Sequence, residues 1–175
     1  MKRSQALRTL LGTVLVTSTA GTAEDVFQAE FKRAWKRSRD YTLTTFNLMP
    51  EEHMGFKPMP EMFAFRTQFT HCITYTTAQL AGRLGVKDPY ADIQGWAQKS
   101  KAEIAAELDR FYEWVGTTIA KVPAVQLAKQ FDFVGESLTG KQLCYALENH
   151  IIHHRGQAIV YLRLKGVTPE SYFGW

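Results

Sequence analysis

Four long segments of this chain repeat their apolar residues at three- and four-residue steps, and this period constrains the fold more than any other feature. Such spacing is typical of amphipathic helices, whose apolar stripes face a shared core. The four segments are residues 24–48, 60–84, 100–122 and 139–165. Helices of about 22–26 residues, with no strand pattern of comparable strength, predict an all-α chain folded as a four-helix bundle.

Proline, glycine and capping residues mark the ends of these segments. The second helix is predicted to begin at Pro60, where a missing N–H does no harm, and to end before Gly85. Two capping-box patterns, Ser100–Glu103 and Thr139–Gln142, open the third and fourth helices. Gly166 ends the fourth helix.

The stretches between the helices are less regular. Residues 86–99 form a long connection, so the second and third helices need not be antiparallel neighbours and a crossover is allowed. Residues 124–138 are predicted to be irregular, although residues 131–134 alternate weakly and allow a short extended segment.

Composition excludes several classes of protein. The chain has 175 residues, 45% of them hydrophobic, which is enough to bury the core of one domain. It contains no run of about 18 apolar residues, so we expect no membrane span in the mature protein. Two cysteines are too few for a disulfide scaffold or a Cys-only zinc site.

The first 23 residues have the three parts of a secretory signal peptide. Basic residues and no acidic ones come first, a short apolar stretch follows at residues 10–16, and small residues lead to Ala23. We predict cleavage after Ala23, with Ala20 as the alternative, and therefore an exported, periplasmic protein whose domain spans residues 24–175. The competing interpretation is an N-terminal arm that stays attached.

Removal of the leader changes the charge balance. The 21 basic residues of the chain fall to 18, against 17 acidic ones, so the formal net charge drops from +4 to +1. A nearly neutral domain is not expected to bind nucleic acid. One basic cluster remains at residues 32–39, and we interpret it as a solvated helix face rather than a phosphate-binding track.

Three of the five histidines lie within five residues on the predicted fourth helix. His150 and His154 are four residues apart, so their side chains share one face and can reach a single ion. They also fall within the apolar stripe of that helix, which contains Leu143, Leu147, Ala158 and Tyr161. Two imidazoles directed at a bundle interior need partners for their ring nitrogens, and a metal ion would satisfy them.

His71, near the middle of the second helix, is the candidate for a third ligand. Its neighbours on the helix are small or polar, and Thr67, Gln68 and Tyr75 are suited to hydrogen-bonding the imidazoles. Three histidines without a carboxylate form a neutral set that leaves a coordination position free, as in catalytic zinc sites. Imidazole suits Zn²⁺, Ni²⁺ and Fe²⁺ alike, so the sequence does not select among them. The competing interpretation of His71 is a hydrogen-bonded core histidine.

The remaining histidines and the cysteines have weaker signals. His153 is rotated away from its neighbours and is interpreted as flanking, at a dimer face or a cleft rim, while His53 is either a solvated loop residue or a cap on the cleft. Cys72 and Cys144 are interpreted as buried free thiols, with a thiolate ligand as the alternative. The chain has no serine-hydrolase elbow, no phosphate-binding glycine loop and no Glu-x-x-His pairing of di-iron bundles.

The run from His150 to Gln157, together with residues 161–166 and 168–172, resembles the C-terminal signature of the DinB-like family of bacterial four-helix-bundle proteins. Residues 56–85 are similar to that family's second-helix region. The resemblance implies an up-down-down-up bundle, frequent homodimers, and a divalent metal held by His71, His150 and His154. The wider superfamily includes thiol-dependent S-transferases and a thiol-dependent isomerase, beside many members without a known reaction. The predicted leader departs from the cytosolic pattern, which weakens the case for a low-molecular-weight thiol.

Two hypotheses of function follow. In the first, the protein is a metal-dependent enzyme, a thiol-dependent S-transferase or a hydrolase, in which the ion acts as a Lewis acid on a small-molecule substrate. In the second, it is a non-catalytic metal-binding or stress-response bundle that the ion stabilises.

Overall fold

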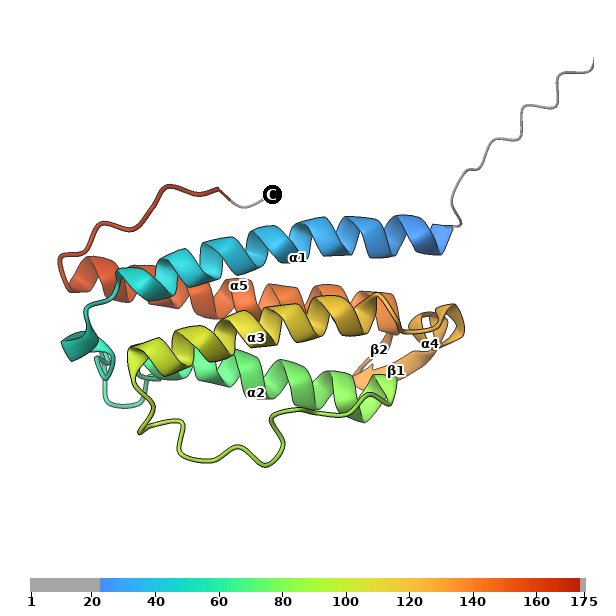
Figure 1. Ribbon diagram of the computed structural model, residues 1–175, viewed down its shortest axis with the longest axis horizontal. Helices are drawn as coiled ribbons and strands as arrows, with labels where there is room; N and C mark the ends of the chain where they lie inside the picture. The colour runs from blue at the N-terminus through green and yellow to red at the C-terminus, as the bar shows by residue number, and fades with distance from the viewer. Residues whose placement is uncertain (1–22, 174–175) are drawn as a thin grey trace, which may run out of the picture.

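The computed structural model describes residues 23–173, which are mostly helical (Figure 1). Within these residues there are four long helices: α1 (Ala23–Leu48), α2 (Phe65–Leu84), α3 (Lys101–Ile119) and α5 (Gly140–Leu164). Short elements join them: the 3-10 helix η1 (Glu51–His53), helix α4 (Ala124–Ala128) and strands β1 (Gln130–Phe133) and β2 (Glu136–Thr139). No helix in this part of the chain is long and apolar enough to cross a membrane. The predicted signal peptide lies outside the described residues, apart from Ala23, which begins α1.

The four long helices lie side by side and enclose the core (Figure 1). Helix α1 packs against α3 and α5, and α2 packs against the same two helices. The predicted apolar stripes supply this core: the stripe of α3 is buried throughout, at Ile104, Leu108, Phe111, Val115 and Ile119. The contact between α2 and α5 is the one that matters for the site, because each of these two helices carries candidate ligands.

Helix α1 is held to α3 by aromatic packing. The Trp35 ring lies 4.7 Å from the Tyr112 ring and 5.8 Å from the Phe111 ring, centroid to centroid. The Trp35 indole Nε1 donates to the Tyr112 carbonyl at 2.8 Å, so the polar atom of this buried ring is satisfied. Burial of aromatic rings of this size dominates core energetics, which explains why α1 is fixed against α3 along its middle.

The predicted helix ends are largely confirmed. Ser100 and Thr139 both form complete capping boxes, in which the cap side chain and the side chain three residues later each accept a backbone N–H. Gly85 ends α2 in the left-handed region, at φ 69°. A glycine adopts this conformation without the steric cost of a Cβ, as predicted for that position.

The predicted start of the second helix at Pro60 is wrong, because α2 begins five residues later, at Phe65. Its first amide groups are satisfied by the preceding loop rather than by a side chain. The Phe65 N–H donates to the Phe56 carbonyl at 2.9 Å, and the Arg66 N–H donates to the Met54 carbonyl at 3.0 Å. This capping depends on the loop folding back on the helix, which a local sequence pattern does not reveal.

The prediction of an all-α chain missed a small hairpin, although its weak alternation was visible at residues 131–134. Strands β1 and β2 pair antiparallel, with Gln130 opposite Thr139 and Phe133 opposite Glu136. Val134 and Gly135 make the turn with positive φ values of 54° and 82°, a geometry that matches the twist of a two-residue hairpin. The hairpin and α4 lie beside the N-terminus of α5 (Figure 1).

Candidate metal centre

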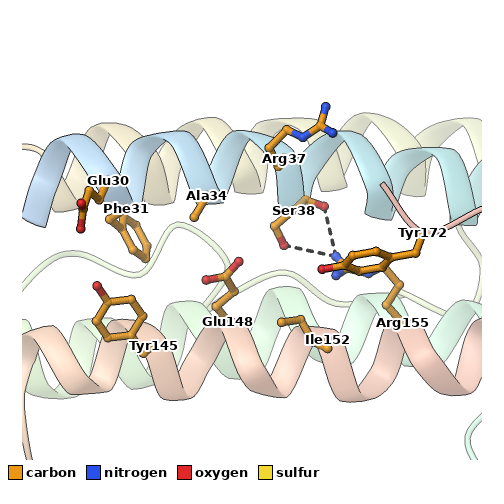
Figure 2. A pocket seen from close by; sticks show the side chains of 10 residues that line it. All are labelled: Glu30, Phe31, Ala34, Arg37, Ser38, Tyr145, Glu148, Ile152, Arg155 and Tyr172. Atoms are coloured by element: carbon orange, nitrogen blue, oxygen red, sulfur yellow. Dashed lines mark hydrogen bonds between the residues drawn. The ribbon is translucent and has the colours of Figure 1, made fainter. Parts of the chain in front are cut away.

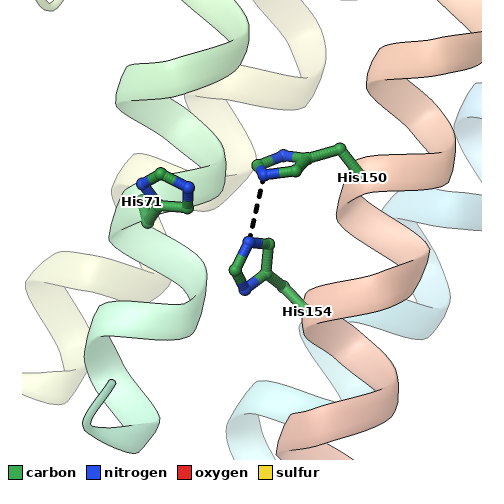
Figure 3. A group of neighbouring side chains, drawn as sticks. All are labelled: His71, His150 and His154. Atoms are coloured by element: carbon green, nitrogen blue, oxygen red, sulfur yellow. Dashed lines mark hydrogen bonds between the residues drawn. The ribbon is translucent and has the colours of Figure 1, made fainter. Parts of the chain in front are cut away.

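Three histidine side chains from two helices converge between α2 and α5. His71 comes from α2, and His150 and His154 come from α5, one turn apart on the same face (Figure 3). The stripe of α5 that carries the pair is otherwise buried and apolar, so packing against α2 directs both imidazoles inward. His154 is buried, whereas His71 and His150 are half-buried. The cluster therefore lies at the edge of the core, where part of it stays accessible.

The spacing of the three rings suits a shared cation. One ring nitrogen from each histidine lies within 4.8 Å of the other two. The Nε2 atoms of His150 and His154 are 3.1 Å apart, and the His71 ring centroid lies 5.1 Å and 4.9 Å from those two rings. Two nitrogens bound to one ion at about 2.1 Å with tetrahedral angles lie about 3.4 Å apart. The α5 pair nearly has this spacing, and His71 needs only a small movement to join it.

A hydrogen-bond chain fixes which nitrogen of His154 is free. The Gln68 amide Nε2 donates to the Tyr161 hydroxyl at 3.1 Å, and that hydroxyl donates to the Phe63 carbonyl at 3.1 Å. The Gln68 Oε1 therefore faces the His154 Nδ1, 2.5 Å away, and requires a proton on that nitrogen. With Nδ1 protonated, neutral His154 presents an unprotonated Nε2 toward His150, as a metal ligand must.

The protein alone does not satisfy His150. Its Nδ1 is buried and has no hydrogen-bond partner among the described residues. If Nε2–H donates to His154, Nδ1 keeps a buried lone pair; if Nδ1 carries the proton instead, two lone pairs face each other across 3.1 Å. A cation between the Nε2 atoms removes this second conflict.

Burial keeps the cluster neutral. Burial, together with the neighbouring imidazoles, lowers the pKa of His154 to about 3 and that of His150 to about 4. The pKa of His71 is also lowered by burial. All three rings are therefore unprotonated at neutral pH, which is the form that binds a metal. The group contains no carboxylate, so a bound divalent ion would keep its full charge.

Two aromatic side chains flank the histidines. The Phe63 ring lies nearly parallel to the His154 ring, at 14° and 6.1 Å between centroids, and 5.2 Å from the His71 ring. The Tyr75 ring lies 4.4 Å from the His150 ring. Phe63 is 43% exposed, so it forms the outer wall of the cluster.

The other predicted candidates lie apart from this group. His53 lies in η1 and is half-buried, outside the cluster. His153 is exposed and flanking, as predicted, and shares a 2.7 Å hydrogen bond with Gln157. Cys72 and Cys144 are free and buried, as predicted, and burial raises the pKa of both thiols to about 12.

Of the three side chains predicted to hydrogen-bond the imidazoles, one does so. Gln68 bonds to His154, but within residues 26–173 neither Thr67 nor Tyr75 hydrogen-bonds an imidazole. Phe63 was not predicted near the histidines, because the predicted second helix began at Pro60 and included it, whereas α2 begins only at Phe65. Its position three residues after Pro60, at the end of a stretch that also holds Pro50 and Pro58, was the available signal.

Comparison with known proteins agrees with this architecture. Residues 34–158 match the profile of the DinB superfamily. A DinB-like protein from Bacillus subtilis has a similar structure, with a TM-score of 0.65 and 19% identity over 83% of this chain and 97% of its own. A DinB-like protein from Bacillus cereus gives a TM-score of 0.60 with the same identity and coverage. At this identity the two structures show the fold alone. No curated protein matches the chain.

Proposed function

We propose that this chain, which belongs to the DinB superfamily, binds a divalent metal ion at His71, His150 and His154 and uses it to act on a small molecule. The observation that carries the proposal is the convergence of three neutral imidazoles from α2 and α5. The half-buried His71 and His150 leave room for a substrate to reach the ion. Zn²⁺, Ni²⁺ and Fe²⁺ are the candidate ions, because imidazole nitrogen suits each of them.

The proposal also includes the wider organisation expected from the sequence. We propose an up-down-down-up four-helix bundle over residues 24–175, exported to the periplasm after loss of the leader and able to form a homodimer. The side-by-side packing of α1, α2, α3 and α5 supports the bundle (Figure 1). The proposed partner is a small-molecule substrate, and the near-neutral domain gives no reason to expect nucleic acid.

The residues around the histidines have separate tasks in this proposal. A bound divalent ion supplies Lewis-acid chemistry, which makes a nucleophile available near pH 7 and fits either a thiol-dependent S-transfer or a hydrolysis. Gln68 holds the Nδ1 proton of His154 and so keeps its Nε2 free. Phe63 and Tyr75 provide apolar surface for the substrate body and limit the access of water.

A second candidate is a non-catalytic metal-binding protein of the stress-response type. The observation that favours it is the absence of any carboxylate from the metal-ligand group in the described residues, since hydrolytic sites commonly use one as a base. In that case the ion would act as a link between α2 and α5 and would stabilise the fold.

Elemental analysis and activity assays on matched variants test the proposal. We expect about one divalent ion per chain, lost in His150→Ala and His71→Ala and retained in His53→Ala, whose histidine lies outside the cluster. Thiol-transfer and ester-hydrolysis activities should disappear in the first two variants only. Metal retention in both cluster variants would refute the proposal, and metal loss that lowers the melting temperature with every assay silent would favour the second candidate.

A further inference from the structure

A cavity lies between α5 and α1, on the side of α5 that packs against α1. It has a volume of about 270 Å³, near the lower end for small-molecule sites, and its walls are mainly apolar. The three histidines face α2, whereas this cavity is lined by α1, α5 and the C-terminal segment (Figure 2). Phe31, Ala34 and Ile152 form its apolar surface, and charged side chains lie along it.

One wall of the cavity carries a buried cation that forms no ion pair with the described residues. Arg155 is only 6% exposed, and its Nη1 donates to the Ser38 and Thr42 hydroxyls at 3.3 Å and 3.0 Å. Its guanidinium also lies 4.6 Å from the centre of the Tyr41 ring. No carboxylate in residues 26–173 lies within salt-bridge distance of it. A buried charge is costly unless an opposite charge accompanies it, so the free edge of this guanidinium suits a carboxylate.

The same wall carries a carboxylate without a partner. Glu148 is half-buried, lies seven residues before Arg155 and therefore shares its face of α5 two turns away. The part of the chain that the structure describes offers it no hydrogen bond or ion pair. Figure 2 shows Glu148 and Arg155 at different points along one groove, with Ile152 between them. Glu30 and Arg37 also line the cavity, so Glu148 and Arg155 are the negative and the positive group that α5 contributes to it. Burial raises the pKa of Glu148 and the Arg155 charge lowers it, so these two groups act on each other across the groove.

The C-terminal segment borders the positive end of the groove. Tyr172 lines the cavity, and the next residue is anchored, since Arg37 donates to the Phe173 carbonyl at 2.6 Å. The Phe173 ring packs 4.5 Å from the Tyr41 ring, centroid to centroid. The end near Arg155 therefore has an aromatic side chain, Tyr172, beside it.

We propose that this cavity binds a free amino acid with an apolar side chain. Its carboxylate pairs with Arg155, its ammonium pairs with Glu148, and its side chain lies against Phe31 and Ala34. A simple anion such as phosphate fits less well, because the Glu148 carboxylate would repel it in a cavity of mainly apolar surface. The site is independent of the metal centre, since none of its lining residues is one of the three histidines.

Isothermal titration calorimetry of the full chain with L-phenylalanine tests this assignment. The titration is carried out in chelator, so that binding to a metal ion does not contribute. We expect saturable binding, weakened at least about tenfold for 3-phenylpropionate, which lacks the ammonium, and for phenethylamine, which lacks the carboxylate. Glu148→Gln should weaken L-phenylalanine binding by a similar factor, and the exposed hairpin control Glu136→Gln should leave it unchanged.

A second variant tests the cavity without removing a charge. Ala34→Leu fills the space beside Phe31 and should abolish the binding of L-phenylalanine. Arg155 is not substituted, because it also bonds α1 and its loss would disturb the helix packing. Absence of saturable binding, equal binding of the one-charge analogues, or full binding by both Glu148→Gln and Ala34→Leu would overturn the proposal.

Discussion

Replacement of Gln68 by leucine should weaken both the metal site and the fold, because this one side chain links His154 to the rest of the core. Gln68 is fully buried and accepts from the His154 Nδ1 while donating to Tyr161 and to the Gln157 Oε1. Leucine has a similar size but no acceptor, so the buried Nδ1–H of His154 would lose its partner. An unsatisfied buried donor of this kind destabilises a protein by about 1–3 kcal/mol.

The expected loss of unfolding free energy and the expected loss of metal affinity can each be measured. For a chain of this length, about 1–3 kcal/mol corresponds to a decrease of about 3–10 °C in the melting temperature of the metal-free protein. Loss of the partner that holds a ligating imidazole in one tautomer weakens metal affinity by about 10–100-fold. Thermal unfolding followed by circular dichroism gives the first value, and competition with a chromophoric chelator gives the second.

Gln68→Glu is the matched control for this prediction. A glutamate keeps the acceptor toward His154 and adds a negative charge, so metal affinity should be retained or increased even though the donation to Tyr161 is lost. Wild-type metal affinity in Gln68→Leu, or an equal loss in both variants, would show that the Gln68–His154 contact does not orient the ligand.

Three further predictions concern stability and reactivity. Burial lowers the pKa values of His150 and His154 to about 4 and 3, below the usual value of 6.5, so the unfolded chain takes up more protons than the folded one as the pH falls. The unfolding free energy of the metal-free protein, measured by urea titration, should therefore drop by about 2 kcal/mol from pH 7 to pH 5, after allowance for the partial exposure of both rings. An unfolding free energy that does not change over this pH range would contradict the prediction. Gly140→Ala should destabilise the protein by about 1–3 kcal/mol, because a Cβ at this position would lie 2.8 Å from the backbone of α4. Gly82→Ala should instead stabilise α2 by up to about 1 kcal/mol in the same assay, because a Cβ there would meet nothing within 4 Å. Both cysteine thiols should resist a thiol reagent at pH 8 in the native protein and react after unfolding, because burial raises their pKa values to about 12; rapid native labelling would contradict that.

Local patterns were sufficient for three of the four long helices and for two of the three clustered histidines. The three- and four-residue period located α1, α3 and α5, and the capping boxes fixed the starts of α3 and α5. The spacing of His150 and His154 guaranteed that both would lie on one face of a helix, because four residues make about one turn. The apolar neighbours in the same stripe indicated that this face would be buried.

Long-range packing decided the remainder. The start of α2 depends on carbonyls of the folded-back loop, and the β1–β2 hairpin forms where the local signal was weak. The Gln68–His154 contact joins residues 86 positions apart, and the Arg155–Thr42 contact joins residues 113 apart. Periodicity says which face of a helix is buried, but not which helix will cover it. His71 lies beside His150 and His154, and Arg155 lines a cavity instead of pairing with a carboxylate, because of the way in which whole helices pack. That packing depends on the shapes of many side chains at once.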